Sequence, residues 1–394
     1  GGSGNISFRN VDAAGQRTLD GQIYTESGDG IRTTSGDITL EAGSGGVYIG
    51  NIVTEDGDFS INVLSTGYAG SLDITTDTGD VTIETDSGFI EIGDIKIGSE
   101  VTKMPGRLRI VSATRDSSKE TANVTIGSIN MKGKIRGEVD IDSQGVLEVK
   151  SGVGVDIKND SGAATAVVNM DSFLRTDIGL LSKSFASLRV FTTSLVGDAT
   201  ARTNFNVGEQ FQVSGDIIVY AKGTRSVPGN VAAYSDLVVK SDMDINLRGV
   251  IVIADAIVNA VSGKAIADAR ADFRTNNGDI VFNNLASRAR GDVHIIANAG
   301  TREGALDAIA LGELSLQAGL KGGESYNIRA NNLDVIAKTI APKGQAAATQ
   351  KVDASRLEIA NREKPPFVQA NEKMMELRVS NDGGGGLVTT GFVE

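Results

Sequence analysis

Pairs of acidic residues are the side chains in this chain whose type and spacing come closest to a reactive site. The segment "TEDGDF" carries Glu55, Asp56 and Asp58, and "SDMDI" carries Asp242 and Asp244. Residues i and i+2 of a strand share a face, so Asp56 with Asp58, or Asp242 with Asp244, could ligate calcium or act as the acid and base of glycan cleavage. No aromatic-rich stretch that would bind sugar rings accompanies them. The interpretation we prefer is therefore a solvated strand face.

Other catalytic constellations are missing from the sequence. The chain has no Cys, which excludes thiolate nucleophiles and zinc-thiolate sites, and its one His excludes a metal site built from several histidines. Alternation in "DVHII" points His294 outward, and neither a Gly-x-Ser-x-Gly elbow nor a phosphate-binding loop occurs. We therefore predict a protein that is not an enzyme and binds no cofactor, with calcium as the one ion to consider.

The tripeptide Arg290-Gly291-Asp292 matches a motif that integrin receptors read in some adhesins. It contains Gly-Asp, a pair that recurs nine times in the chain, so an Arg before one copy is expected by chance. A receptor role for these three residues is the weaker interpretation.

Charge and composition exclude several classes of partner. The 394 residues carry a net charge of −12 without long runs of either sign, so neither nucleic acid nor an anionic membrane is an expected partner. No apolar run approaches the length of a transmembrane helix. The chain begins "GGSGNISF" and its first methionine is Met104, which indicates a chain cut from a longer precursor.

A repeated strand signature predicts the fold. Gly-Asp followed by apolar-x-apolar starts at residues 36, 57, 79, 93, 215, 278 and 291, and the first three starts are 21 and 22 residues apart. In "GFIEIGDIKIG", residues 88–98, alternation stops at Gly-Asp and resumes at once. Glycine accepts unusual dihedral angles and a polar residue caps the turned backbone, so the pair indicates a corner rather than a hairpin.

These patterns predict an all-β fold, a right-handed parallel β-helix or β-solenoid with coils of about 21 residues. A second register, in "VYIGNI", "IEIGDI" and "VTIGSI", supports several short strands in each coil. An antiparallel sandwich of immunoglobulin-like modules is the competing fold, but it usually has a buried Trp or Cys. The chain has neither residue.

The expected organisation is one continuous solenoid over residues 1–340, with loops or irregular insertions near 101–123 and 163–213. The Ala-rich stretch 254–272 is compatible with a helix, although Ser262-Gly263 favours tightly packed small-residue coils. Residues 341–394 are expected to form an arm with prolines, a four-glycine hinge and a terminal strand.

The Gly-Asp cadence, the Asn- and Ala-rich coils "HIIANAG" and "IRANNLDVIA" and the absence of Cys resemble the filamentous-haemagglutinin-like repeats of secreted bacterial surface proteins. In that family the repeats form long right-handed parallel β-helices that serve in adhesion and as exposed fibres. The resemblance implies a secreted, extracellular protein of the bacterial cell surface, with cell-surface or glycan contact. The Asn-Pro-containing secretion motifs that precede such repeats are not found.

We expect a structural subunit that self-assembles head-to-tail into a filament or cell-surface layer through its terminal strands. A solenoid end exposes unpaired strand edges, and a detachable strand behind a hinge can pair with a neighbouring copy. The candidate assembly residues are Leu387, Val388, Phe392 and Val393. The alternatives are a stalk or fragment of a large secreted adhesin and, third, a polysaccharide-active β-helix enzyme.

Overall fold

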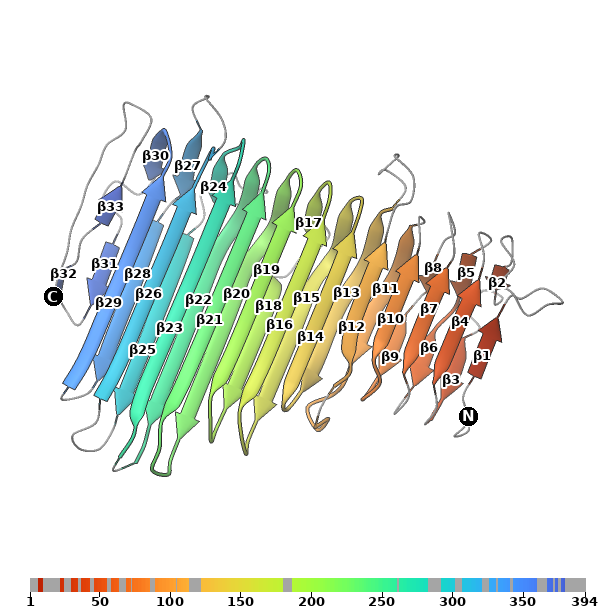
Figure 1. The fold of residues 1–394 in the computed structure, drawn as a ribbon, viewed down its shortest axis with the longest axis horizontal. Helices are drawn as coiled ribbons and strands as arrows, with labels where there is room; N and C mark the ends of the chain where they lie inside the picture. Colours follow the sequence, from red (N-terminus) through yellow and green to blue (C-terminus); the bar gives the residue numbers. More distant parts are fainter. Residues whose placement is uncertain are drawn as a thin grey trace. The chain divides into compact units, whose positions relative to one another are not determined.

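The computed structural model consists of strands joined by turns and loops, with no helix among the residues that it describes. Those residues are 6–9, 22–24, 30–34, 37–42, 46–54, 58–63, 69–71, 73–85, 89–103, 105–112, 122–179, 186–260, 262–282, 292–301, 307–320, 326–330, 332–340, 343–359, 367–370, 373–374 and 377–379. The chain divides into two compact units, residues 1–156 with 168–183 and residues 157–167 with 184–394. We describe each unit by itself (Figure 1).

Three parallel ladders of strands wind through the first unit. Ladder 1 contains β1 (Ile6–Arg9), β4 (Ile38–Ala42), β7 (Phe59–Val63), β10 (Val81–Thr85), β12 (Arg107–Ser112) and β14 (Arg136–Ser143). Ladder 2 contains β2 (Gln22–Tyr24), β5 (Gly46–Ile49), β8 (Ala69–Ser71), the first parts of β11 (Ile90–Ile97), β13 (Val124–Gly133) and β15 (Leu147–Asn159), and β17 (Thr176–Ile178). Ladder 3 contains β3 (Ile31–Thr33), β6 (Ile52–Thr54), β9 (Ile74–Thr76) and the second parts of β11 and β13. The chain visits the ladders in the order 1, 2, 3 and returns to ladder 1 one coil later.

The second unit repeats this winding with longer strands. Ladder 1 contains β19 (Ala199–Val207), β21 (Val231–Ser241), β23 (Lys264–Thr275), β26 (Asp307–Gln317), β29 (Lys343–Asp353) and β33 (Leu377–Val379). Ladder 2 contains the first parts of β20 (Phe211–Arg225) and β22 (Ile245–Val258), then β24 (Ile280–Phe282), β27 (Asn327–Ala330) and β30 (Arg356–Ile359). Ladder 3 contains β18 (Ala186–Ser194), the second parts of β20 and β22, β25 (Asp292–Thr301), β28 (Asn332–Ile340) and β31 (Phe367–Ala370), which pairs antiparallel with β32 (Lys373–Met374). Strand β16 (Ala164–Ser172) belongs in part to each unit.

The prediction of a parallel β-solenoid is therefore confirmed, while its handedness stays a prediction. The coil of about 21 residues is found in the first coils, where Ile38 pairs with Phe59 and Phe59 pairs with Val81. It does not extend to the second unit, because Ala199 pairs with Ala233, 34 residues further along. The coils grow because ladder 1 lengthens from the five residues of β7 to the eleven of β21, and ladder 3 from the three residues of β6 to the ten of β25. Adding residues in pairs preserves the inward and outward alternation of a strand.

Two of the expected boundaries are wrong. Residues 163–213, predicted to be irregular, contain β16, β17, β18 and β19. Buried positions alternate in β16, in β19 and in the described part of β18, and all three residues of β17 are buried. The sequence looked irregular because the alternation of inward and outward residues starts anew after each corner. Residues 343–359 continue the solenoid, since β29 pairs with β26 over its whole length, from Lys343 to Asp353. Of the other predicted insertion, residues 107–112 form β12.

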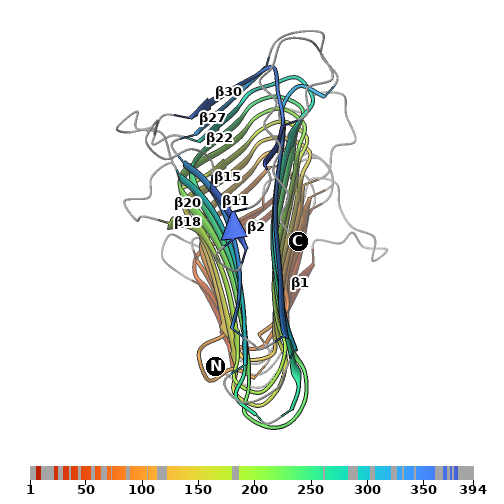
Figure 2. The ribbon, with the colours of Figure 1, turned by 90° about the vertical axis from the view of Figure 1, so that its left-hand side faces the viewer.

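The core of the second unit is narrow between ladders 1 and 3, which form the two long sides of each coil when the unit is viewed along its stack (Figure 2). Ladder 1 contributes the buried column Ala199, Ala233, Ala267 and Ala310, and ladder 3 contributes Ala221, Ala254, Ala297 and Ala337. The Ser235 hydroxyl donates a hydrogen bond to the Ile253 carbonyl across this gap. The Ala-rich stretch is thus strand, as the small-residue interpretation predicted, because small side chains let the two sheets approach closely.

Larger side chains fill the wider part of the core, beside ladder 2. Phe205 packs on Phe211 with ring centroids 4.6 Å apart, and Phe273 meets Phe282 edge-on at 5.5 Å. All four rings are buried. Such pairs add attraction beyond the area that they bury and fix the position of ladder 2 against ladder 1.

Candidate functional site

Corner aspartates join several neighbouring coils of the first unit. The Asp37 Oδ1 accepts a hydrogen bond from the backbone N–H of Asp58 at 3.1 Å, and the Asp58 Oδ1 accepts one from the N–H of Asp80 at 3.0 Å. The Asp80 Oδ1 continues the ladder to the N–H of Arg107 at 2.7 Å. Gly106 precedes Arg107, and a Cβ atom there would lie 1.8 Å from the Gly79 carbonyl oxygen. A glycine is required at such a corner because the backbones of stacked corners nearly touch, and where an aspartate follows the glycine its carboxylate binds the next coil.

The same device recurs in the second unit at the corner before ladder 2. The Asp244 Oδ1 accepts a hydrogen bond from the N–H of Asp279 at 2.8 Å, and the Asp279 Oδ1 accepts one from the N–H of Asn327 at 2.7 Å. At the corner before ladder 1, Asp198 receives the N–H of Ala232 at 2.8 Å. An aspartate that follows a corner thus binds a backbone amide of the following coil in both units.

Three of the four predicted calcium candidates accept hydrogen bonds from other coils. Asp58 and Asp244 hold backbone amides, and Asp242 accepts a hydrogen bond from the Asn276 side-chain amide. Asp56 lies outside the described residues. Among the residues that the structure describes, no group of three or more acidic or histidine side chains is arranged to hold a metal ion.

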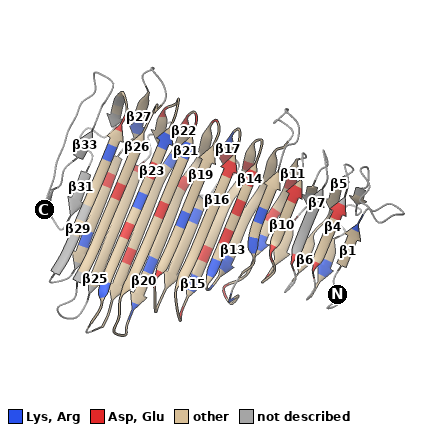
Figure 3. Cartoon of the chain, in the orientation of Figure 1, with Lys and Arg blue, Asp and Glu red and all other residues tan. Residues whose placement is uncertain are grey.

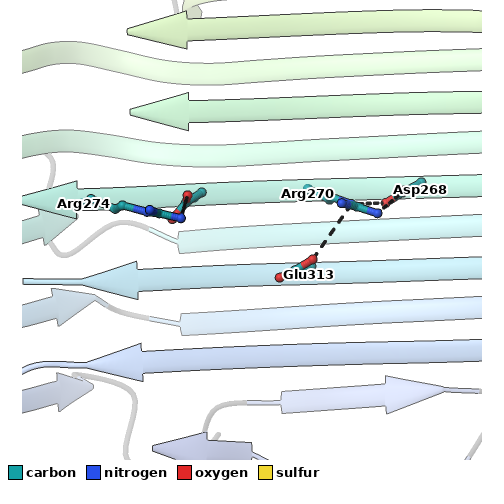
Figure 4. A network of polar contacts seen from close by, with 5 residues as sticks. Asp268, Arg270, Arg274 and Glu313 are labelled. Carbon is teal, nitrogen blue, oxygen red and sulfur yellow. Dashed lines mark hydrogen bonds and ion pairs between the residues drawn. The ribbon is translucent and has the colours of Figure 1, made fainter. Parts of the chain in front are cut away.

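The outer face of ladder 1 in the second unit is charged (Figure 3). One column runs Arg202, Asp236, Arg270 and Glu313 across β19, β21, β23 and β26, with the signs alternating. Within β23, Arg270 bonds Asp268 through Nη2 at 2.7 Å and reaches Glu313 on the next strand at 3.9 Å (Figure 4).

Burial raises the pKa of Asp236, against the lowering effect of Arg202 and Arg270. In the same column the hydrogen bonds that the Arg270 guanidinium donates to the Asp268 carboxylate raise the pKa of Arg270. Charges paired in this way favour one register and one neighbour, and each exposed pair contributes little free energy.

The outer face of ladder 3 in the second unit is different, because aromatic and aliphatic side chains follow one column. We call this column the apolar stripe; its members, all partly exposed, are Phe191, Tyr220, Ile253, Ile296 and Ile336. Ile218 and Ile251 lie beside it in the adjacent column. The Arg189 guanidinium stacks 4.0 Å over the Phe191 ring, whose centroid is 5.4 Å from that of Tyr220.

Polar groups border the apolar stripe. The Tyr220 hydroxyl donates to Asp255 Oδ2 at 3.0 Å, and the Asn298 amide donates to Asp255 Oδ1 at 2.8 Å. Burial and the Asp255 carboxylate raise the pKa of Tyr220 far above its usual value, so the phenol stays protonated. His294 points outward as predicted, and its Nδ1 lies 3.1 Å from Asp334 Oδ2.

The first coil of the first unit exposes residues that belong to core columns. Phe8 pairs with Leu40 in ladder 1, yet Phe8 is 48% exposed and Leu40 is 0% exposed. Ile6, Ile23 and Ile31 are likewise partly exposed, whereas Ile38, Val47 and Ile52 of the next coil are buried. We call Ile6, Phe8, Ile23 and Ile31 the end surface. It is apolar, and it adjoins the free edges of β1, β2 and β3 in the described part of the chain.

The remaining predicted site residues are only partly described. Asp292 begins β25, and its Oδ1 accepts a hydrogen bond from the Asn332 side-chain amide at 2.7 Å. Asp292 therefore takes part in the pairing of β25 with β28 in ladder 3. Arg290 and Gly291 lie outside the described residues, as do the assembly candidates Leu387, Val388, Phe392 and Val393. Strand β33, at Leu377–Val379, is the last described strand of ladder 1.

Sequence reasoning missed both apolar surfaces. The signal for the apolar stripe was the run "GVIVIADAIV", residues 249–258, in which Val250 and Val252 alternate with Ile251 and Ile253. A strand with apolar residues on both faces is typical of burial on both sides. In this strand, however, the face that carries Ile251 and Ile253 points outward and is partly exposed.

Comparisons of the chain with protein-family models, with curated proteins and with solved structures found no match. The described residues contain no helix whose length and apolar character would let it cross a membrane.

Proposed function

We propose that the chain is a non-enzymatic structural subunit, exported to the bacterial cell surface, which associates end to end through the terminal coils of its solenoid. The observation that carries this proposal is the end surface, where Phe8 occupies a core position and is 48% exposed. An uncovered core column beside free strand edges favours the addition of another strand layer. A filament or a surface layer is the assembly that follows from such contacts.

The use of the carboxylates supports a structural role. The acidic residues that could have served as acid and base, such as Asp58 and Asp244, are bonded to backbone amides of adjacent coils. Composition supports export, because a Cys-free, Gly-rich chain without Trp resembles secreted bacterial surface repeats.

The ends differ in size, which constrains the contact. Strand β1 has four residues, whereas β29 near the other end of ladder 1 has eleven. A head-to-tail contact therefore pairs β1 with only one part of the ladder 1 edge, where β33 already pairs with Gln350–Val352 of β29.

The test compares the purified chain with two variants at rising concentration, by negative-stain electron microscopy and sedimentation velocity. Phe8→Asp places a charge on the end surface, and Ser7→Asp places the same charge on the outward side of the same strand. We expect end-to-end assemblies of the wild type and of Ser7→Asp, and their loss in Phe8→Asp. Isolated particles of the wild type at every concentration would overturn the proposal and favour a stalk or adhesin fragment.

Deletion of residues 383–394 tests which segment of the neighbouring copy contacts the end surface. The sequence prediction that Leu387, Val388, Phe392 and Val393 take part in assembly requires the deleted chain to lose its end-to-end contacts. If the deleted chain still assembles, the prediction for these four residues is wrong and the contact is made by the described strands.

A further inference from the structure

The apolar stripe forms a regular surface. Its five side chains lie in register on the neighbouring strands β18, β20, β22, β25 and β28. Strands in a sheet are about 4.8 Å apart, so the stripe is roughly 19 Å long. Regular columns of this kind make a surface that fits another sheet better than a small molecule, because face-to-face sheets pack their side chains about 10 Å apart.

The area is sufficient for a stable contact. Strand β25 has ten residues, about 33 Å at 3.3 Å per residue. Multiplied by roughly 19 Å, the ladder 3 face covers about 600 Å², and two such faces bury about 1,200 Å² in total. That value lies within the range of specific protein interfaces.

The charges around the apolar stripe suit a second copy of the chain. The columns that flank it carry the cationic residues Arg189, Lys222 and Lys338, the acidic residues Asp255 and Asp334, and His294. The whole chain has a net charge of −12, so this face is nearly neutral where the protein is otherwise acidic. Two copies meeting here avoid the general repulsion between acidic surfaces.

We propose that the apolar stripe is a lateral docking surface for a second copy of the chain, related by a two-fold axis parallel to the direction in which the coils stack. Each stripe residue then faces its own counterpart, Ile253 opposite Ile253 and Ile296 opposite Ile296. The strands run antiparallel across the contact.

The flanking columns select this arrangement. With the axis parallel to the stack, the column of Ile251 faces the column of Asp255 at each level, and no pair of like charges meets. Asp334 comes level with Lys338 of the second copy, on the same strand. With the axis along the strands instead, Asp255 would face Asp255, and like charges directly opposite each other destabilise a contact.

Sedimentation velocity of the full chain carrying Phe8→Asp tests the lateral dimer without end-to-end contacts through the end surface. The result therefore distinguishes a failure of the lateral dimer from a failure of end-to-end assembly. In this background, Ile253→Lys should weaken the dimer at least tenfold. Val238→Lys is the matched control, because Val238 is a partly exposed apolar residue on the outer face of ladder 1 in β21. Its dimer should be unchanged. A chain that stays monomeric without stripe substitutions, or equal losses in the two variants, would overturn the proposal.

Cross-linking tests the orientation. The chain has no cysteine, so a single introduced cysteine is the only thiol. Ile296→Cys should form a covalent dimer with a short bis-maleimide, and Val238→Cys should not. In the alternative arrangement Ile296 faces Tyr220, so a dimer that fails to cross-link through Ile296→Cys would overturn the parallel axis.

Discussion

Replacing Asp58 separates two opposing contributions of the corner aspartates. Its Oδ1 accepts the N–H of Asp80 at 3.0 Å, while its own N–H bonds the Asp37 carboxylate at 3.1 Å. Asp58→Asn keeps an acceptor oxygen and removes the charge. Asp58→Ala removes both the acceptor and the charge. The main difference between the variants is therefore the hydrogen bond that the side-chain oxygen accepts.

The magnitudes follow from the stacking of the corners. Carboxylates on successive coils are about 5 Å apart, which gives roughly 0.8 kcal/mol of repulsion per neighbour in water and about half that at physiological salt. Removing the charge thus relieves about 0.9 kcal/mol from two neighbours. Losing a hydrogen bond costs about 1 kcal/mol. We expect Asp58→Asn to be at least as stable as the wild type, and Asp58→Ala to be about 1 kcal/mol less stable than Asp58→Asn.

Hydrogen exchange measured by mass spectrometry is the suitable assay, because solenoids open locally and a single unfolding transition averages over many coils. The peptide covering β7 and β10 should exchange about fivefold faster in Asp58→Ala than in Asp58→Asn, which corresponds to about 1 kcal/mol. Raising the salt concentration should stabilise the wild type relative to Asp58→Asn. Equal exchange in the two variants would refute the role of the corner hydrogen bond.

Two further substitutions test the core and the charge distribution. Phe273→Ala removes a buried ring that packs on Phe282 and should lower the free energy of unfolding by about 3–5 kcal/mol, read from urea unfolding followed by circular dichroism; a loss below about 1 kcal/mol would contradict the packing described. Burial, together with Asp142 and Asp140, raises the pKa of Asp171 above 3.8, so the folded state binds more protons than the unfolded chain just above that pH, and stability falls as the pH rises through this window. Asp171→Asn should therefore be more stable than the wild type at pH 7 and equal to it at pH 3, and the same difference at both values would contradict this assignment.

The corners were the part of the fold that the sequence predicted best. Gly-Asp pairs at Asp37, Asp58 and Asp80 indicated corners, and these aspartates do form one ladder. Their bonding partner was not predictable, because an aspartate that caps its own turn and one that binds the next coil give the same local pattern. Only the register between coils distinguishes the two.

The growth of the coils was not predictable from the repeat spacing. The interval of 63 residues between Gly215 and Gly278 looked like three coils of 21 residues. Asp216 lies before ladder 3 and Asp279 before ladder 2, so the two pairs mark different corners. The alternation of apolar and polar residues is the same in a short strand and in a long one, so longer strands leave the local sequence pattern unchanged.

The exposed surfaces depend on tertiary structure in a similar way. Phe8 has the sequence context of a core residue, and its exposure follows from its place in the first coil. For Ile253 and Ile296, the sequence shows apolar residues on both faces of a strand and does not say which face is covered.

The direction of the corner hydrogen bonds has a consequence for how such a chain acquires its structure. In each pair the carboxylate belongs to the earlier coil and the amide to the later one, as with Asp37 and Asp58. A completed coil therefore presents a preformed row of acceptors and acts as a template on which the next stretch of polypeptide is ordered. A chain that folds from its amino end would order coil by coil against a surface that already exists, and each step would pay the entropy of one coil only.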